Sequence, residues 1–166
     1  MVADIRTATV ADLPAILDIY NHAILTTTAV YDYAPHTLEM RQQWYDAKQA
    51  DGLPVVVAVV AAQVVGFGAL SWFRAWAAYQ HTVENSIYIA PSHHGQGIGK
   101  QLLRELIDQA KQRQMHTIVA GIDAENIASQ KLHQGLGFEP VGRFRQVGYK
   151  FDRWLDLIFW QLMLSD

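Results

Sequence analysis

The chain of 166 residues contains no cysteine. This absence excludes disulfide bonds, thiolate metal sites and cysteine nucleophiles. Charge is also scarce, since charged residues make up 17% of the chain and hydrophobic residues 51%. Such a composition is typical of a folded globular protein. The length predicts a single domain, 1–166, with its own core.

A surplus of basic residues is missing as well, because 13 Lys and Arg stand against 16 Asp and Glu. Nucleic-acid binders usually carry such a surplus, so we expect no nucleic-acid partner. The most apolar stretch, WLDLIFWQLML, contains Asp156 and Gln161 and is shorter than the ~20 residues of a spanning helix. The N-terminal residues include early acids and no apolar run, unlike a signal peptide. We therefore expect a cytoplasmic protein with no membrane partner.

Hydrophobic periodicity predicts alternating strands and helices. Runs rich in β-branched or aromatic residues indicate strands over 4–10, 54–60, 63–73, 81–90 and 116–123. Helical spacing indicates helices over about 11–24, 38–49, 100–113 and 127–136. Two long closing strands join near Lys150, and the three strands within 54–90 are expected to be adjacent and antiparallel. The expected fold class is α/β (α+β), a mixed, mostly antiparallel sheet flanked by about four helices.

The segment HHGQGIGKQL, 93–102, places glycine at 95, 97 and 99 directly before a predicted helix. A helix start offers unpaired N–H groups and a positive dipole end to an anion, and glycine lets the backbone approach a pyrophosphate. A turn without a ligand favours glycine too. The glycines alone therefore leave both interpretations open.

Two general phosphate-binding patterns fit this loop poorly. A Walker loop ends in G-K-[ST], whereas Lys100 is followed by Gln101. A dinucleotide fingerprint, G-x-G-x-x-G, has two residues between its second and third glycines, whereas this loop has one, and here four extra residues separate the strand from the glycines. Asp123 does lie about where the ribose-binding acid of such a site would be. The neighbouring His93 and His94 are not expected to bind metal, because adjacent side chains point apart and no ligand set accompanies them.

A third pattern covers much more of the chain. The segment SIYIAPSHHGQGIGKQLL, 86–103, resembles the loop [QR]-x-x-G-x-[GA] with which the GNAT family of N-acetyltransferases binds the pyrophosphate of acetyl-CoA, with His94 in place of the usual Gln or Arg. The block GIDAENIASQKLHQGLGFEPVG, 121–142, is similar to the family's next block. IYNHAI, HTVENSIYIAP and VGYKFDRWLDLIFWQL resemble the phosphinothricin / methionine sulfoximine acetyltransferase subfamily.

The resemblance implies acetyl-CoA as co-substrate, and the residues give no reason to expect a metal. Backbone N–H groups from Tyr88 to Ala90 would bind the thioester carbonyl, since the family's strands diverge there. Asn126 would contact the pantetheine arm, and it is also a good N-cap. The predicted cofactor-binding residues are Ile87, Tyr88, Ile89, His94, Gly95, Gln96, Gly97, Ile98, Gly99, Lys100 and Asn126.

Acetyl transfer to an amine needs a base, because the amine is largely ammonium at neutral pH. The resemblance implies Glu84 in this role, and a solvent-facing carboxylate is the alternative. His133 stands where many relatives have a Tyr that protonates the departing thiolate. An imidazole could supply that proton, serve as a second base, or be structural.

The acceptor pocket is predicted from aromatic residues and one arginine. Arg74, within LSWFRAW, suits an acidic group of the acceptor, because arginine binds carboxylate or phosphinate through two parallel hydrogen bonds. Tyr31, Trp72, Val147 and Gly148 are predicted to line the same pocket, with packing as the alternative for Trp72.

We therefore expect an acetyl-CoA-dependent N-acetyltransferase acting on the α-amino group of a small amino acid or analogue, such as phosphinothricin, methionine sulfoximine or methionine sulfone. Direct transfer is expected, because the chain has no cysteine and no recognisable serine triad. A non-catalytic acyl-CoA-binding module and an acetyltransferase for another amine stay open as alternatives. The aromatic-rich closing strands favour a homodimer, although core packing also explains them.

Overall fold

A computed structural model describes residues 2–164. Its elements follow the predicted order of strand, two helices, three strands, helix, strand, helix and two strands. The helices are α1 (Leu13–Thr26), α2 (Leu38–Ala50), α3 (Ile98–Gln112) and α4 (Ile127–Gln134). The strands are β1 (Asp4–Thr7), β2 (Val55–Val60), β3 (Gln63–Trp72), β4 (Thr82–Ile89), β5 (Thr117–Asp123), β6 (Glu139–Lys150) and β7 (Arg153–Met163).

The first strand is shorter than predicted. It ends at Thr7 because Val10–Asp12 forms a 3-10 turn, so α1 begins at Leu13. The Asp12 carboxylate accepts a hydrogen bond from the Thr9 amide at 2.7 Å and pairs with Arg6 at 2.8 Å. These contacts turn the chain out of the sheet and into α1.

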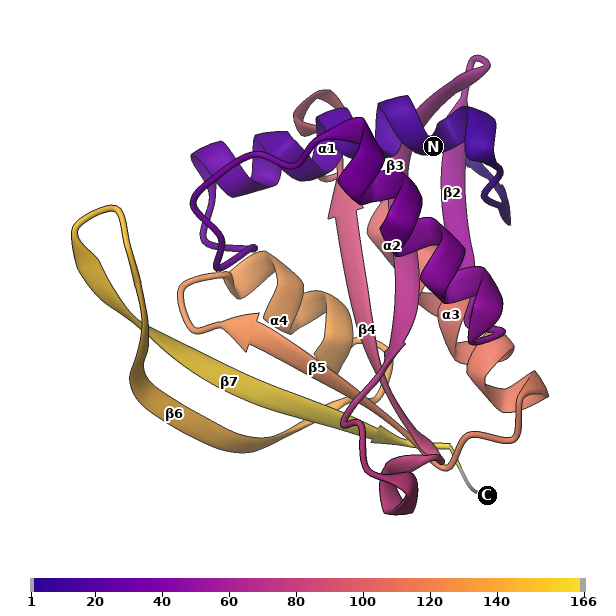
Figure 1. The fold of residues 1–166 in the computed structure, drawn as a ribbon. Coiled ribbons are helices and arrows are strands. Elements are labelled where there is room, and N and C mark those ends of the chain that lie inside the picture. The colour runs from indigo at the N-terminus through magenta and orange to yellow at the C-terminus, as the bar shows by residue number, and fades with distance from the viewer. Residues whose placement is uncertain (1, 165–166) are drawn as a thin grey trace.

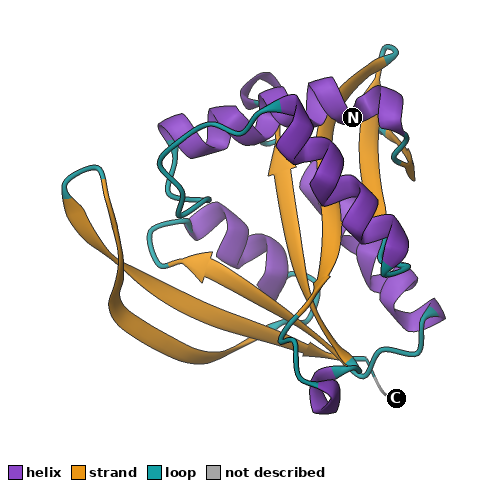
Figure 2. Cartoon of the chain, in the orientation of Figure 1, coloured by secondary structure: helices purple, strands orange, loops and turns teal. Residues whose placement is uncertain are grey.

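The strands form one sheet in the order β1-β2-β3-β4-β5-β7-β6. Neighbours β2, β3 and β4 are antiparallel, as predicted, whereas β4 and β5 are parallel, which makes the sheet mixed. Helices α1 and α2 cover one face of β2–β4 and α3 the other, as Figures 1 and 2 show. In residues 2–164 no helix combines the length and apolar character needed to cross a membrane.

Strands β4 and β5 separate soon after they start. Their pairing runs from Thr82 with Thr117 to Glu84 with Val119, and beyond that point the two strands diverge (Figure 1). The β5-facing edge of β4 after Glu84 therefore has no partner strand. This opening places the end of β4 beside the candidate site.

Two apolar layers hold the sheet in place. On the α3 side, Leu102, Leu103 and Leu106 are fully buried, which confirms the predicted apolar face of that helix. On the other side, Ile16 and Phe67 are buried beneath α1 and α2. Burial of these side chains contributes most of the driving force for folding.

Strands β6 and β7 form a hairpin that reaches beyond the body of the protein (Figure 1). Its turn is formed by Phe151 and Asp152, next to Lys150 as predicted. The buried Lys150 ammonium donates to the carbonyls of Ile24, Thr27 and Val30 at 2.5, 2.9 and 2.6 Å. One side chain thus holds the hairpin to the last turn of α1 and to the segment after it.

Candidate active site

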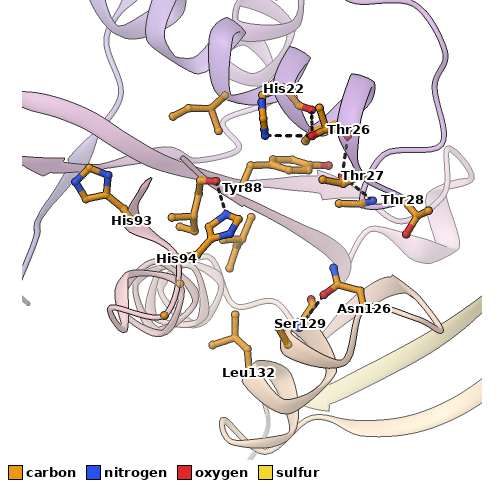
Figure 3. A pocket seen from close by; sticks show the side chains of 18 of the residues that line it. His22, Thr26, Thr27, Thr28, Tyr88, His93, His94, Asn126, Ser129 and Leu132 are labelled. Atoms are coloured by element: carbon orange, nitrogen blue, oxygen red, sulfur yellow. Dashed lines mark hydrogen bonds between the residues drawn. The ribbon is translucent and has the colours of Figure 1, made fainter. Parts of the chain in front are cut away.

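A cavity of about 660 Å³ lies at the open end of β4. Its walls come from the C-terminal half of α1 and the segment after it, the end of β4, the glycine-containing loop with the start of α3, and α4 (Figure 3). We call it the large cavity. No element supplies it alone, because it forms where β4 and β5 have separated.

The glycine loop has the conformation that an anion-binding helix start requires. Gly95 and Gly97 have φ of +73° and +80°, a region that other residues rarely adopt, and Gly97 is the N-cap of α3. A Cβ atom at either position would meet nothing within 4 Å, so both positions border open space. The N–H groups of the first turn of α3, which have no partner within the helix, therefore lie beside the large cavity.

Gly99 and His94 hold the glycine loop and α3 against neighbouring elements. A Cβ at Gly99 would lie 3.2 Å from Leu132 Cδ2, so this glycine lets α3 pack closely on α4. His94 Nε2 donates to the Ile89 carbonyl at 2.9 Å, which fastens the loop to the end of β4 (Figure 3).

Most of the predicted cofactor-binding residues surround one space. Gln96 and Lys100 are not among the residues that line the large cavity. Asn126 lines it and also caps α4, since its side chain accepts from the Ser129 amide at 3.1 Å. The predicted residues that line it are Ile87, Tyr88, Ile89, His94, Gly95, Gly97, Ile98, Gly99 and Asn126.

The backbone donors of β4 differ from the predicted set. The Ala90 amide donates to the Val65 carbonyl at 2.8 Å, and the alternation of an antiparallel ladder turns the Tyr88 amide to β3 as well. These two amides are therefore occupied, and the prediction for them was wrong. The Ile89 amide, which the prediction included, faces the opening between β4 and β5, and so does the amide of Ile87, which it did not include.

A smaller cavity, of about 250 Å³, adjoins the large one and shares Ala29, Ile87, Tyr88, Asn126 and Ser129 with it. Glu84 and His133 both line this small cavity. The two predicted catalytic residues, far apart in the sequence, therefore meet in one place.

Glu84 lies at the point where β4 and β5 separate. Burial raises the pKa of this carboxyl group, while the charges of Arg74 and Lys48 and a hydrogen bond from the Gly121 backbone lower it. Burial dominates, so the pKa lies above its ordinary value. A carboxylate with a raised pKa is a better proton acceptor at neutral pH.

His133 is buried, with 3% of its surface exposed. Its Nδ1 donates to the Ser129 carbonyl at 2.8 Å, and its Nε2 accepts from Asn85 Nδ2 at 3.0 Å. These partners fix a neutral tautomer, because a carbonyl oxygen can only accept. Burial also lowers the pKa of this imidazole. Both ring nitrogens are thus occupied in this state.

The predicted acceptor residues do not all gather at the cavities. Tyr31 lines the small cavity, and its hydroxyl donates to Asp123 Oδ2 at 2.5 Å. Arg74 is exposed; it donates to the Phe73 carbonyl at 2.9 Å, and its Cζ lies 4.3 Å from the centre of the Phe73 ring. Trp72 and Val147 are exposed and line none of the cavities described here.

Gly148 packs directly against Tyr31. A Cβ atom at Gly148 would lie 2.6 Å from Tyr31 Cε2, which is closer than side chains tolerate. We expect Gly148→Ala to displace the Tyr31 ring, break its bond to Asp123 and lower the melting temperature by several degrees. Thermal unfolding of this variant and of Gly142→Ala, where an added Cβ meets nothing within 4 Å, checks the prediction. Equal melting temperatures of the two variants would contradict it.

Several lining residues were not among the predicted site residues, although some of them lie in segments that carry the resemblance. His22, Thr26, Thr27 and Thr28 bring polar groups from α1 and the segment after it into the large cavity (Figure 3). Glu125 and Arg153 form an ion pair of 2.6 Å at its wall. Their segments look like ordinary helix, loop and strand ends, and only the fold brings them together. Within 2–164 no group of three or more His, Asp or Glu side chains is placed to hold a metal ion.

A family model and individual known proteins match this chain, and both point to the same family. The model of the acetyltransferase (GNAT) family matches residues 16–138. An L-methionine sulfoximine/L-methionine sulfone acetyltransferase of Pseudomonas paraeruginosa is 47% identical over 99% of this chain and 96% of its own.

Two solved structures extend the comparison. A phosphinothricin acetyltransferase from Sinorhizobium meliloti in complex with acetyl-CoA has a TM-score of 0.97 and 36% identity, over 99% of this chain and 90% of its own. A ribosomal-protein-alanine N-acetyltransferase from Brucella melitensis has a TM-score of 0.95 and 47% identity, over 96% and 99%. The chain therefore belongs to the acetyltransferase (GNAT) family.

Proposed function

We propose that this protein transfers the acetyl group of acetyl-CoA to the α-amino group of a small amino acid or analogue. The candidates are methionine sulfoximine, methionine sulfone and phosphinothricin, the acceptors after which its relatives are named. The observation that carries the proposal is the position of Glu84. It lines a small cavity that adjoins a larger one, and the larger one is bordered by a helix start whose glycines suit an anion.

The residues around the large cavity fit acetyl-CoA. The positive-φ glycines and the first turn of α3 suit a pyrophosphate, and the polar end of α1 and Asn126 suit an amide-containing arm. The inward-facing amides of Ile87 and Ile89 suit a thioester carbonyl and the oxyanion that follows. When bound, acetyl-CoA supplies a thioester whose acetyl group passes to the amine and whose sulfur leaves with a proton.

Glu84 prepares the acceptor. Its carboxylate takes one proton from the ammonium group, directly or through water, and frees the nitrogen lone pair for attack on the carbonyl carbon. The C–N bond forms, the C–S bond breaks, and the second proton of the nitrogen goes to the sulfur. Glu84 then returns its proton to solvent.

His133 has three candidate roles, as acid, as second base or as structural residue. Its buried, neutral ring with two occupied nitrogens supports the structural role, in which it positions Asn85 and α4. The catalytic role stays a prediction. Either way, His133 lies in the same small cavity as Glu84.

The proposal is tested by mixing the purified protein with acetyl-CoA and a panel of amino-acid analogues and following thiol release. A chain without cysteine gives this assay a clean background. We expect release with the three candidate acceptors. Tight acetyl-CoA binding without release would instead identify a non-catalytic acyl-CoA-binding module.

A second acceptor class has a specific observation in its favour. The Brucella structure is named for a ribosomal-protein alanine and is 47% identical to this chain. A peptide that begins with alanine therefore belongs in the same panel. Release with the peptide alone would assign this protein to protein N-terminal acetylation.

Three further expectations belong to the proposal. They are a single domain over 1–166, a cytoplasmic location and a homodimer. The exposed apolar side chains of the hairpin support a homodimer, because a monomer gains nothing by exposing them. They are Val141, Phe144, Val147, Tyr149, Phe151 and Trp154.

A further inference from the structure

Asn85 is a buried polar residue to which the proposed function assigns no contact with a ligand. Its side chain is 7% exposed and lines the small cavity together with Glu84 and His133. The amide nitrogen Nδ2 donates to His133 Nε2 at 3.0 Å. The amide oxygen Oδ1 is buried as well, and no group within residues 2–164 donates a hydrogen bond to it. A buried acceptor without a partner is costly, so this oxygen suits a donor that a ligand brings.

His133 determines which atom of the Asn85 amide is left for a ligand. The ring Nδ1 donates to the Ser129 carbonyl at 2.8 Å, so in the neutral ring Nε2 can only accept. Asn85 must therefore present its NH₂ group to the ring, and its oxygen stays without a partner. The opposite orientation of the amide would require a second proton on the ring. Burial opposes that proton, because it lowers the pKa of His133.

Asn85 and Glu84 project from opposite faces of the sheet, because neighbouring residues of a strand alternate between the faces. Glu84 is paired with Ser71, whereas Asn85 is paired with Leu70, which belongs to the apolar layer on the α3 side. Helix α4, which carries His133, packs against α3 on that same side. The small cavity is thus bounded by the proposed base from one face and by Asn85 with its histidine from the other.

These two faces correspond to the two groups that a direct transfer places on the carbonyl carbon. The attacking amine must meet Glu84, so it approaches from the face of that carboxylate. The leaving sulfur is the other group on the carbon and is carried by the coenzyme. The large cavity, which suits the coenzyme, is bordered by the start of α3 and by α4, the helices on the Asn85 side. The sulfur is therefore expected on the side of Asn85.

Other side-chain acceptors of the small cavity already have partners. Asp123 accepts at both carboxylate oxygens, from the Tyr31 hydroxyl at 2.5 Å and from the Glu125 amide at 2.9 Å. The Asn126 oxygen is used in capping α4. Among the buried amide and carboxylate oxygens on the Asn85 side, the described chain therefore offers Asn85 Oδ1 to a donor at the sulfur.

We infer that Asn85 binds the free thiol of coenzyme A, with Oδ1 accepting the S–H hydrogen. This inference rests on the proposed function, which makes coenzyme A the product released from this site. The sulfur of acetyl-CoA carries no hydrogen, so the contact forms only after the C–S bond has broken and the sulfur has received its proton. Asn85 therefore distinguishes product from co-substrate, because it strengthens the binding of coenzyme A and adds nothing to that of acetyl-CoA.

Calorimetric titration with three ligands tests this inference without turnover. They are coenzyme A, acetyl-CoA and S-methyl-coenzyme A, a thioether that keeps the sulfur but has no S–H group. The measured ratio is Kd for S-methyl-coenzyme A over Kd for coenzyme A, in the wild type and in Asn85→Leu. Leucine keeps the approximate volume of the side chain and removes the oxygen. We expect the ratio to fall by about 3- to 5-fold, a modest change because S–H is a weak donor.

The matched control is Asn126→Ser, in which serine can still cap α4 while a side chain lining the large cavity changes. It should change the affinities of all three ligands together and leave the ratio as in the wild type. A merely structural role of Asn85 would do the same in Asn85→Leu, and an unchanged ratio there would overturn the inference. If Asn85→Leu fails to fold, Asn85→Ser, whose side chain is shorter, is titrated instead, with the same expected fall and the same contradicting result.

Failure of the proposed function gives a different result. If no acceptor supports thiol release but the ratio falls in Asn85→Leu, the proposed acetyl transfer is wrong and the thiol contact stands. If thiol is released and the ratio does not change, the transfer stands and the thiol contact is wrong. A wild type that binds none of the three ligands would overturn both.

Discussion

Replacing Glu84 by Gln is expected to lower kcat by about 10²- to 10⁴-fold while leaving acetyl-CoA affinity unchanged. The amide keeps the shape of the side chain that lines the small cavity but cannot take a proton. Because the residues that border the large cavity stay intact, binding of acetyl-CoA is preserved. Single-turnover kinetics and calorimetric titration with acetyl-CoA measure the two quantities separately.

The pH dependence gives this prediction a second measurement. Wild-type kcat/KM is expected to rise with pH as Glu84 ionises, above the ordinary value of 4.5 because burial raises its pKa. The contribution of this carboxyl group to the free energy of unfolding falls as pH rises. It is fully present below the ordinary pKa and is lost as pH rises through the raised one. Glu84→Gln, which stays neutral, is therefore expected to be more stable than the wild type at neutral pH.

A matched control is Glu39→Gln, at an exposed position in the first turn of α2. It is expected to keep both turnover and stability. Wild-type turnover in Glu84→Gln would exclude this residue as the base. A loss of turnover together with a loss of stability at neutral pH would mean that the substitution damages the fold.

Replacing Lys150 by Met is expected to lower the free energy of unfolding by about 3 kcal/mol. The ammonium satisfies three backbone carbonyls at once, one of them in the last turn of α1, where a positive charge is also favoured. Methionine keeps the volume and leaves these oxygens without their donor. For a chain of this length the melting temperature should fall by about 6–12 °C. Denaturant unfolding and thermal melts measure both.

The same substitution should weaken acetyl-CoA binding. Thr27, whose carbonyl Lys150 holds, lines the large cavity, so releasing it loosens one wall. The control is Lys131→Met, an exposed lysine on α4, with an expected change within about 0.5 kcal/mol. Equal unfolding free energies of the two variants would contradict the prediction, because they would mean that water replaces the ammonium as hydrogen-bond donor to the three carbonyls.

The fold was largely predictable from local patterns. The apolar spacing in 100–113 gave α3 and its buried face, and the β-branched runs in 54–90 gave three adjacent antiparallel strands. Such periodicities are properties of short segments, so they can be read directly from the sequence. The boundary at Thr7 was missed because Asp12 captures the Thr9 amide, a contact that depends on the turn itself.

The candidate site was predictable only in part. The glycines at 95 and 97 and the resemblance around Glu84 identified the loop and the carboxylate. Lys100 was included for its position in the loop, yet it does not line the large cavity. Arg74 was favoured because it stands among aromatic residues; its side chain is exposed, and its charge acts on Glu84. Which charges lie near Glu84 depends on the fold and is not a local property of the sequence.

The sequence alone therefore determined the order of the elements, the glycine loop and the family, because each is encoded by residues close together in the chain. The tertiary structure decided which atoms face one another. The divergence of β4 and β5 after Glu84 opens the cavities, and ladder alternation selects the amides of Ile87 and Ile89. Packing brings Lys150 of the hairpin to the end of α1, where its ammonium donates to the Ile24 carbonyl. These features depend on the distance between segments in space, which no pattern within one segment records.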